Sequence, residues 1–162
     1  MAILKVFNGL ENGKSKYRDE TATDDVLSYI KQEDKTHGLV GGWAVDPQNA
    51  AYEMNTLNQS VHKEGGVSIR HFVISLDSEV SAEKMFELAK EFSLYYGEAY
   101  QIVYAVHQDT KHIHSHYGMN TVNYQTKGKY RGTYRDLYDF ENHCNAVLKK
   151  HGIKERLVYQ AK

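Results

Sequence analysis

Apolar and polar residues alternate along this chain in two rhythms, and each rhythm predicts a different kind of element. Short, strongly apolar runs have the length and composition of β-strands, and they occur at 2–7, 67–76, 100–106 and 117–123. Other stretches repeat apolar residues every three or four positions, as an amphipathic helix does. Four such helices are predicted: from Thr21 or Thr23 to about Glu33, from Gln48 or Asn49 to Gly65, from Ser81 to Gly97, and from Thr133 to Gly152.

The resulting order of elements is β-α-α-β-α-β-β-α. This order, with the last two strands adjacent in sequence, predicts an α+β fold in which a largely antiparallel central sheet is flanked by helices. We expect one domain over residues 1–162, because the chain shows no repeat, linker or second domain. Residues 36–49 are predicted to be a loop, and residues 153–162 a tail or the start of a missing partner segment. The alternation slips at Arg70-His71, which indicates a bulge or a strand buried on both faces.

The composition is that of an ordinary globular protein with a hydrophobic core. Of the 162 residues, 41% are hydrophobic and 25% are charged, and the formal net charge is −1. This near-neutral balance argues against a strongly basic nucleic-acid-binding domain, although charge can still be concentrated locally. The single cysteine, Cys144, lies on an apolar helix face and is expected to be buried. One cysteine, no signal peptide and no membrane span together predict a cytoplasmic protein.

Histidines are concentrated between the last two predicted strands. Four of the nine histidines fall within 107–116, together with Asp109. Side chains alternate along a strand, so His112, His114 and His116 would share one face. Imidazole is a common ligand for divalent metals, and three imidazoles on one surface indicate a metal site. No cysteine lies nearby, which argues against a zinc finger.

Two different sets of three histidines are compatible with this pattern. If the chain turns back after His107 through a four-residue connection, His107 lies opposite His112, and the set is His107, His112 and His114. A six-residue connection places His107 opposite His114 instead, and the set becomes His107, His114 and His116. Hairpins permit both lengths, so the pattern by itself leaves both sets open.

A second stretch of the chain combines basic and aromatic residues. Within 124–138, four cations interleave with four tyrosines: Lys127, Lys129, Arg131 and Arg135 with Tyr124, Tyr130, Tyr134 and Tyr138. Cations contact phosphates and aromatic rings stack on unpaired bases, so this stretch suits a nucleic-acid strand. A solvated loop with ordinary charges would have the same composition, and both interpretations stand.

The histidine pattern resembles one found in a family of nucleases. This is the relaxase/mobilization nuclease family, whose HUH-type endonucleases nick DNA to start conjugative transfer. Its metal-binding motif is similar to this run of residues: His107-x-Asp109-x-x-His112-x-His114-x-His116, followed by Asn120 and Val122-Asn123. Ser115 departs from the motif, which has a hydrophobic residue between its paired histidines.

Three further segments carry the resemblance, and with the histidines they extend over most of residues 1–152. Tyr29, within residues 27–31 and ahead of Lys35-Thr36, is similar to the N-terminal nucleophile motif of the family. Residues 70–75 resemble its middle strand, and residues 128–131 resemble the segment after the histidine strand. Without this resemblance, Tyr29 would be interpreted as an aromatic residue of the core or its rim.

The resemblance implies a site and a reaction. The family's ligand positions correspond to His107, His114 and His116, which selects the second of the two sets. Tyr29 would be the nucleophile, and Asp109 would orient His107 or accept the proton of Tyr29. The product would be a covalent 5′-phosphotyrosine, formed when one strand is nicked at an origin of transfer.

The same resemblance implies cofactors and partners. Phosphate oxygens and water would complete the metal shell, which suits Mn²⁺ or Mg²⁺. The implied substrate is single-stranded DNA at an origin-of-transfer hairpin or nick site, and accessory relaxosome proteins and a coupling protein are the implied partners. Contacts to DNA are expected from residues of the basic stretch: Lys127, Lys129, Tyr130, Arg131 and Arg135.

Two other functions fit parts of the pattern. One is a rolling-circle replication initiator or transposase of the same superfamily, in which Tyr124 would be the nucleophile. The other is a non-catalytic, metal-stabilised module that binds single-stranded DNA. A relaxase, a replication initiator or a transposase leaves DNA attached to the protein after denaturation, whereas a binding module does not.

Overall fold

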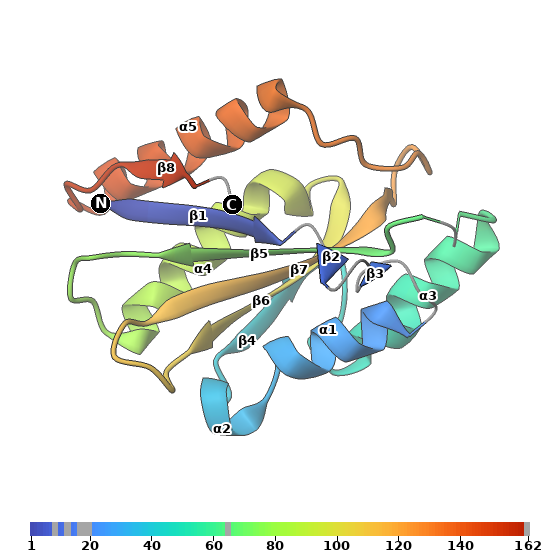
Figure 1. Ribbon diagram of the computed structural model, residues 1–162, viewed down its shortest axis with the longest axis horizontal. Helices are drawn as coiled ribbons and strands as arrows, with labels where there is room; N and C mark the ends of the chain where they lie inside the picture. Colours follow the sequence, from blue (N-terminus) through green and yellow to red (C-terminus); the bar gives the residue numbers. More distant parts are fainter. Residues whose placement is uncertain (8–9, 12–13, 16–20, 64–65, 161–162) are drawn as a thin grey trace.

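A six-stranded sheet forms the centre of the molecule (Figure 1). The structure is a computed structural model that describes residues 1–7, 10–11, 14–15, 21–63 and 66–160. In spatial order the strands of the sheet are β4 (Val40–Trp43), β6 (Tyr100–His107), β7 (His114–Asn123), β5 (Ile69–Ser75), β1 (Ala2–Phe7) and β8 (Leu157–Tyr159). Neighbouring strands are antiparallel except β1 and β8, which are parallel. The predicted α+β fold with a largely antiparallel sheet is confirmed.

The remaining elements are helices and one small hairpin. The hairpin pairs β2 (Leu10–Glu11) with β3 (Lys14–Ser15). The helices are α1 (Ala22–Ile30), α2 (Glu33–Thr36), the 3₁₀ helix η1 (Pro47–Asn49), α3 (Ala50–Ser60), α4 (Ala82–Gly97) and α5 (Tyr134–Lys150). None of these helices combines the length and the apolar character that a membrane crossing requires.

Helices cover both faces of the sheet (Figure 1). α4 and α5 pack on one face over the larger core, in which Phe72 and Phe140 are fully buried. Cys144 belongs to this core, as expected from its apolar helix face. α1 and α3 cover the other face over a smaller core that includes Leu27 and Met54.

Two predicted helix starts are confirmed by their capping hydrogen bonds. The Ser81 hydroxyl oxygen accepts a hydrogen bond of 3.0 Å from the backbone N–H of Lys84. The Thr133 hydroxyl oxygen accepts one of 3.0 Å from the backbone N–H of Asp136. These bonds satisfy donors that have no partner inside the helix. Beyond α5, Gly152 has a φ of +72°, the left-handed conformation typical of a helix end.

The prediction of a loop over 36–49 was wrong, because this segment contains the edge strand β4. β4 pairs with β6, with Gly41 opposite Tyr104. Two glycines hide the strand pattern, because they contribute no apolar side chain. A Cβ at Gly41 would lie 2.5 Å from the ring of Tyr104, so the glycine is required by close packing and not by a turn.

The prediction of a C-terminal tail was also wrong. β8 adds three residues to the sheet beside β1, with Leu157 opposite Ala2. Leu157 is buried, whereas its neighbour Val158 is exposed. A strand this short has too few residues to show a period, so only its pairing partner reveals it.

Several predicted boundaries shift. α1 ends at Ile30 and the short α2 follows, where one helix to about Glu33 was predicted. α3 ends at Ser60 and not at Gly65, which lies outside the described residues. β7 begins at His114, so the strand includes two of the histidines. The slip in alternation at Arg70-His71 does not mark a bulge, because β5 pairs with β7 and with β1 in an unbroken register. It reflects a strand that is covered on both faces.

One glycine sets how closely α1 approaches the sheet. Gly118 of β7 lies beneath the helix, and a Cβ there would be 3.0 Å from Leu27 Cδ2 and 3.1 Å from Ile30 Cδ1. Native cores contain little spare volume, so any larger residue pushes these side chains away. Because Tyr29 lies between Leu27 and Ile30 in sequence, its position over the sheet depends on this contact.

We predict that Gly118→Val lowers the free energy of unfolding by about 1–3 kcal/mol, the usual cost of overpacking a core. Urea denaturation followed by circular dichroism measures the change. Gly128→Val is the matched control, since a Cβ at Gly128 would meet nothing nearer than Thr126 Oγ1 at 3.5 Å. Equal stability of the two variants would contradict the close packing of α1 on the sheet.

Candidate active site

The register of β6 and β7 decides which histidines face one another. His107, the last residue of β6, pairs with His114, the first residue of β7. The connection therefore spans six residues, from 108 to 113, and the longer of the two predicted connections is confirmed. His112 lies in this connection and is exposed.

Three imidazoles gather on the sheet face that α1 covers. The rings of His107 and His116 stack with their centroids 3.8 Å apart, and those of His114 and His116 meet edge to face at 6.5 Å. His71 of β5 joins them, because its Nε2 lies 3.2 Å from Nδ1 of His116. His71 was not among the predicted site residues. Its place beside Arg70 in a buried strand was the available signal.

The hydrogen bonds of the rings determine which nitrogens remain for a ligand. Nε2 of His107 lies 2.8 Å from the carbonyl oxygen of Ile30. A carbonyl oxygen only accepts, so this nitrogen carries the proton and Nδ1 keeps its lone pair. Nδ1 of His114 lies 3.4 Å from the Thr110 hydroxyl, which leaves Nε2 of that ring to bind.

Burial keeps these rings neutral. Burial, more than the neighbouring histidines, lowers the pKa of His116 to about 2. Burial also lowers the pKa of His107 and of His114. Neutral imidazole is the form that binds a metal, so this donor set suits a divalent transition metal.

The three nitrogens do not yet converge on a single point. A close metal site would have one nitrogen from each of His107, His114 and His116, all within 4.8 Å of one another. These three described residues do not meet that condition. The donor types fit a metal, whereas the ring positions in this structure do not form a closed site.

Tyr29 projects from the last turn of α1 toward the same histidines. Its neighbours Leu27 and Ile30 are buried, whereas Tyr29 is 42% exposed. The ring centroid of Tyr29 lies 5.4 Å from that of His107 and 5.8 Å from that of His116, both in edge-to-face contact. Tyr29 is thus a partly exposed residue at the edge of the histidine cluster, with its ring reachable from solvent.

Asp109 contacts a cation. Its carboxylate accepts a hydrogen bond of 2.7 Å from Lys35 Nζ, and this bond is the main reason that the pKa of Asp109 is lowered. Lys35 Nζ in turn lies 5.6 Å from the ring centroid of Tyr29. The backbone N–H of Gln108 donates to the Lys35 carbonyl at 2.7 Å, which holds α2 against the histidine connection. Lys35 belongs to the segment that resembles the nucleophile motif, but no role was predicted for it.

The cations predicted to contact DNA differ in their exposure and in their hydrogen bonds to the protein. Arg131 is exposed, and Arg135 forms an exposed ion pair with Asp139 at 3.3 Å. The Lys127 ammonium donates to the carbonyl of Tyr124. Lys129 is half-buried, and burial lowers its pKa. Its ammonium donates three hydrogen bonds, to the Val67 carbonyl at 2.8 Å, to Thr121 Oγ1 at 2.9 Å and to the Lys63 carbonyl at 3.4 Å.

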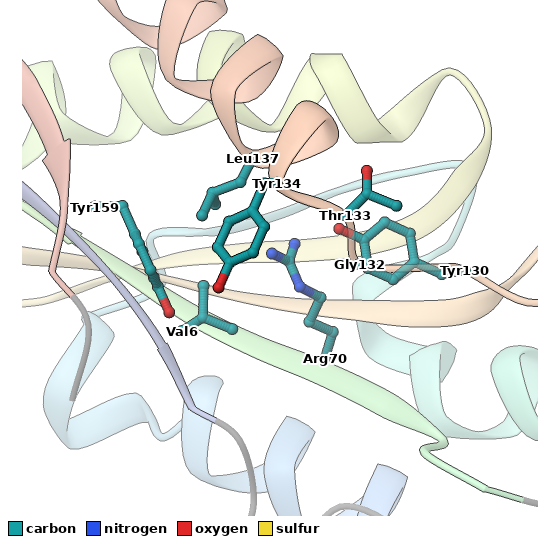
Figure 2. A pocket seen from close by; sticks show the side chains of 8 residues that line it. All are labelled: Val6, Arg70, Tyr130, Gly132, Thr133, Tyr134, Leu137 and Tyr159. Atoms are coloured by element: carbon teal, nitrogen blue, oxygen red, sulfur yellow. The ribbon is translucent and has the colours of Figure 1, made fainter.

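Tyr130, the aromatic residue predicted to contact DNA, lies at a cavity away from the histidines. Figure 2 shows its ring at one side of this cavity, with the guanidinium of Arg70 projecting into the middle. The Tyr130 hydroxyl donates a hydrogen bond of 2.5 Å to Asp136 Oδ2. The structure therefore places Tyr130 beside Arg70 and apart from the exposed Arg135.

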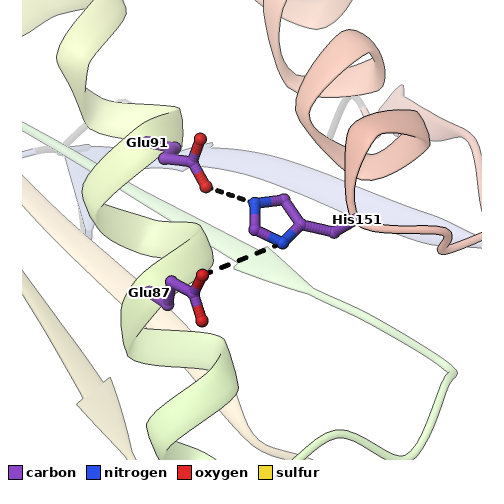
Figure 3. Close-up of side chains that lie close together, drawn as sticks. All are labelled: Glu87, Glu91 and His151. Atoms are coloured by element: carbon purple, nitrogen blue, oxygen red, sulfur yellow. Dashed lines mark hydrogen bonds and ion pairs between the residues drawn. The ribbon is translucent and has the colours of Figure 1, made fainter.

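A compact acidic and histidine cluster lies between α4 and α5 (Figure 3). It consists of Glu87, Glu91 and His151, whose ligand atoms all lie within 4.8 Å of one another. Two lysines pair with its carboxylates: Lys150 Nζ lies 2.7 Å from Glu91, and Lys84 Nζ lies 3.6 Å from Glu87. We interpret this cluster as an ion-pair network that joins the two helices.

Comparisons with known proteins bear on the whole fold. A family model described as relaxase, MobA/VirD2-like, nuclease domain, matches residues 22–153. A solved structure described as "Molecular Basis of Vancomycin Resistance Transfer in Staphylococcus aureus" is similar, with a TM-score of 0.53 and 18% sequence identity over 76% of this chain and 75% of that chain. This likeness concerns the fold alone. No curated protein matches the chain.

We predict that Lys129→Met lowers the free energy of unfolding by about 1–3 kcal/mol, because a charged donor is removed from partly buried oxygens. Arg135→Gln, at an 85% exposed side chain, should change it by less than about 0.5 kcal/mol. Thermal melts at pH 7 compare the two variants with the parent protein. A larger loss for Arg135→Gln than for Lys129→Met would show that the hydrogen bonds of Lys129 do not stabilise the fold.

Proposed function

Because the chain belongs to the family of MobA/VirD2-like relaxase nuclease domains, we propose that it nicks one DNA strand at an origin of transfer, with Tyr29 as the nucleophile. The single observation that carries the proposal is the place of Tyr29. It is the partly exposed tyrosine in ring contact with His71, His107 and His116.

The proposed reaction is a transesterification. The hydroxyl oxygen of Tyr29 forms a bond to the scissile phosphorus, and the bond from phosphorus to the 3′-oxygen breaks. The proton lost by Tyr29 is balanced by the proton that the departing 3′-hydroxyl gains. The 5′ end stays on the protein as a phosphotyrosine, so the bond is conserved for later rejoining without ATP.

The chain's own charges support this reaction. Lys35 holds a positive charge 5.6 Å from the Tyr29 ring, which favours the phenolate that develops as the proton leaves. Asp109 is paired with Lys35, so we propose that it positions this cation. This role differs from the two that the sequence suggested for Asp109, which were orienting His107 and accepting the Tyr29 proton.

We propose His107, His114 and His116 as ligands of a divalent metal, as relaxases generally use one, and Mn²⁺ or Mg²⁺ as the ion. When bound, such an ion supplies positive charge that neutralises the scissile phosphate oxygens. The neutral state of the three rings, caused by their burial, supports this ligand set. His71 would position His116 through the contact between their ring nitrogens.

We propose single-stranded DNA at an origin-of-transfer hairpin or nick site as the substrate, with accessory relaxosome proteins and a coupling protein as partners in the cytoplasm. The exposed cations Lys127, Arg131 and Arg135 are the proposed phosphate contacts of the basic stretch. Lys129 would act there mainly by holding the stretch against the sheet, since its ammonium donates to protein oxygens.

The replication-initiator reading is less well supported. Its nucleophile would be Tyr124, whose hydroxyl donates a hydrogen bond of 2.8 Å to the carbonyl of Gly97. Tyr124 follows β7 at the end opposite His114. It is eight residues beyond His116 (116 to 124), which at ~3.3 Å per residue corresponds to roughly 25 Å along the strand.

We predict that Tyr29→Phe abolishes the covalent adduct while the fold, metal binding and DNA binding persist. The change removes one hydroxyl from a partly exposed ring, so stability should change by at most ~1 kcal/mol. Protein incubated with Mn²⁺ and single-stranded DNA that carries a plasmid origin is run on a denaturing gel, and the modified tyrosine is mapped by mass spectrometry. Tyr124→Phe is the control and should keep the adduct.

An adduct that survives in Tyr29→Phe and maps to Tyr124 would favour the replication initiator or transposase. Failure of the parent protein to form any adduct, with DNA binding intact, would favour the non-catalytic binding module.

We predict that alanine at His107, His114 or His116 weakens Mn²⁺ binding at least ~10-fold, because each change removes a ligand. His112→Ala should have little effect, since His112 is exposed in the connection. Electron paramagnetic resonance of free Mn²⁺ during titration of chelator-treated protein measures the affinity. Loss of binding in His112→Ala, with His116→Ala unaffected, would mean that His107, His112 and His114 are the ligands.

A further inference from the structure

A cavity of about 600 Å³ lies on the sheet face opposite the histidines. Figure 2 shows that its walls come from β1 and β5 below, the start of α5 above, β8 at one side, and the segment of Tyr130 and Thr133 at the other side. The walls are largely apolar or aromatic, with Val6, Leu137, Tyr130, Tyr134 and Tyr159 among the lining residues. This volume is within the range of small-molecule sites, which are about 300–1,000 Å³.

Arg70 is the only cation that lines this cavity among the described residues. Its guanidinium lies against three aromatic rings, 4.9 Å from the centroid of Tyr130, 5.1 Å from that of Phe72 and 5.3 Å from that of Tyr96. These contacts hold the group in place but provide no hydrogen-bond acceptor in the ring plane. Nη1 is buried and has no acceptor within the described part of the chain.

The carboxylate of Asp136, at the start of α5, is occupied by tyrosine hydroxyls. Tyr95 donates to Oδ1 at 3.1 Å, and Tyr96 and Tyr130 donate to Oδ2 at 2.8 Å and 2.5 Å. Tyr96 and Tyr130 also lie over the guanidinium. The acid therefore fixes the aromatic walls, and Nη1 of Arg70 stays without an acceptor among the described residues.

We propose that this cavity binds a guanine base of the DNA strand. Arginine pairs in two-pronged fashion with the O6 and N7 acceptors of guanine, the commonest specific contact between arginine and a base. Adenine offers a donor where guanine has O6, and the pyrimidines lack N7, so these bases satisfy Arg70 less well. The aromatic walls suit a planar base that stacks. A phosphate is a poorer fit, because a single cation and apolar walls leave most of its oxygens without donors.

A second cavity lies beside this one. It has a volume of about 320 Å³ and shares Arg70, Tyr130 and Gly132 with the first. Phe7 also lines it, and the ring of Phe7 stacks on His71 with centroids 4.6 Å apart. In the proposed binding mode, a strand that passes the histidines continues past Phe7 along these two cavities, with a base of the same strand in the Arg70 cavity.

Tyr134 provides a surface for the bound base. Its ring is 90% exposed although it lines the cavity, so it gains contact area when a base enters. This inference rests on the proposed function for the identity of the strand, and it adds to that function a base-reading site remote from the nick.

The first experiment measures binding of single nucleotides without any nicking. The probes are the four deoxynucleoside 5′-monophosphates, titrated into the whole chain and followed by NMR of Tyr and Arg side chains. dGMP should bind more tightly than dAMP, dCMP and dTMP. Arg70→Gln should lower dGMP affinity at least ~10-fold, the size of a two-pronged arginine–guanine contact. Arg156→Gln, at an exposed arginine outside both the cavity and the basic stretch, should leave it unchanged.

Two further variants test the proposal if Arg70→Gln fails to fold. Tyr134→Ala removes an exposed ring and should weaken dGMP binding without loss of stability. Arg70→Lys keeps the charge and loses the two-pronged donor, so discrimination against dAMP should fall. Equal binding of all four nucleotides by the parent protein, or unchanged preference in both arginine variants, overturns the proposal.

The second experiment separates this inference from the proposed nicking activity. A random single-stranded DNA library is bound to the parent protein and to Arg70→Lys, and the recovered strands are sequenced. The parent should enrich one position in guanine, and the variant should lose that enrichment. Guanine enrichment without any adduct would refute the nicking function alone, whereas an adduct without enrichment would refute the guanine site alone.

Discussion

The antiparallel pairing of β6 with β7 is the constraint on which the rest of the structure depends. In this register His107 lies opposite His114, and Ala105 lies opposite His116. Because side chains alternate along a strand, a shift of one residue would turn the histidines into the core beneath α4. The same shift would remove Tyr117 from this core, where it is fully buried and stacks on Phe72 with centroids 4.6 Å apart. The aromatic core on one face therefore fixes the position of the imidazoles on the other.

The packing of α1 on the sheet gives these imidazoles their chemical state. Gly118 lets Leu27 and Ile30 approach β7, and the carbonyl of Ile30 then meets His107. The helix thus removes water from the histidines, which lowers their pKa, and leaves Tyr29 at the exposed edge. Burial of the rings and exposure of the tyrosine are two results of one contact.

Arg70 and His71 show how a single strand serves two sites. They are adjacent in β5, so their side chains point to opposite faces of the sheet. His71 lies against His116, while Arg70 lies between aromatic rings that Asp136 orients. A strand buried on both faces ties the two sites together rigidly, because neither residue can move without disturbing the other.

The sequence by itself determined the fold class, the main helices and the run of histidines within 107–116. These features depend on period, on capping residues and on residue type, all of which are local. The resemblance to relaxases also drew attention to Tyr29, which its helical pattern alone would have assigned to the core. Local patterns missed β4, where glycines replace apolar side chains, and β8, which is too short to show a period.

Only the tertiary structure decided which residues meet. The choice between His112 and His114 as the partner of His107 depends on a strand register, and both connection lengths were allowed by the sequence. The contacts of His71 with His116, of Lys35 with Asp109 and of Lys129 with Val67 join residues that are 45, 74 and 62 positions apart. No local pattern encodes such pairs, because they form only when the sheet and its helices pack together.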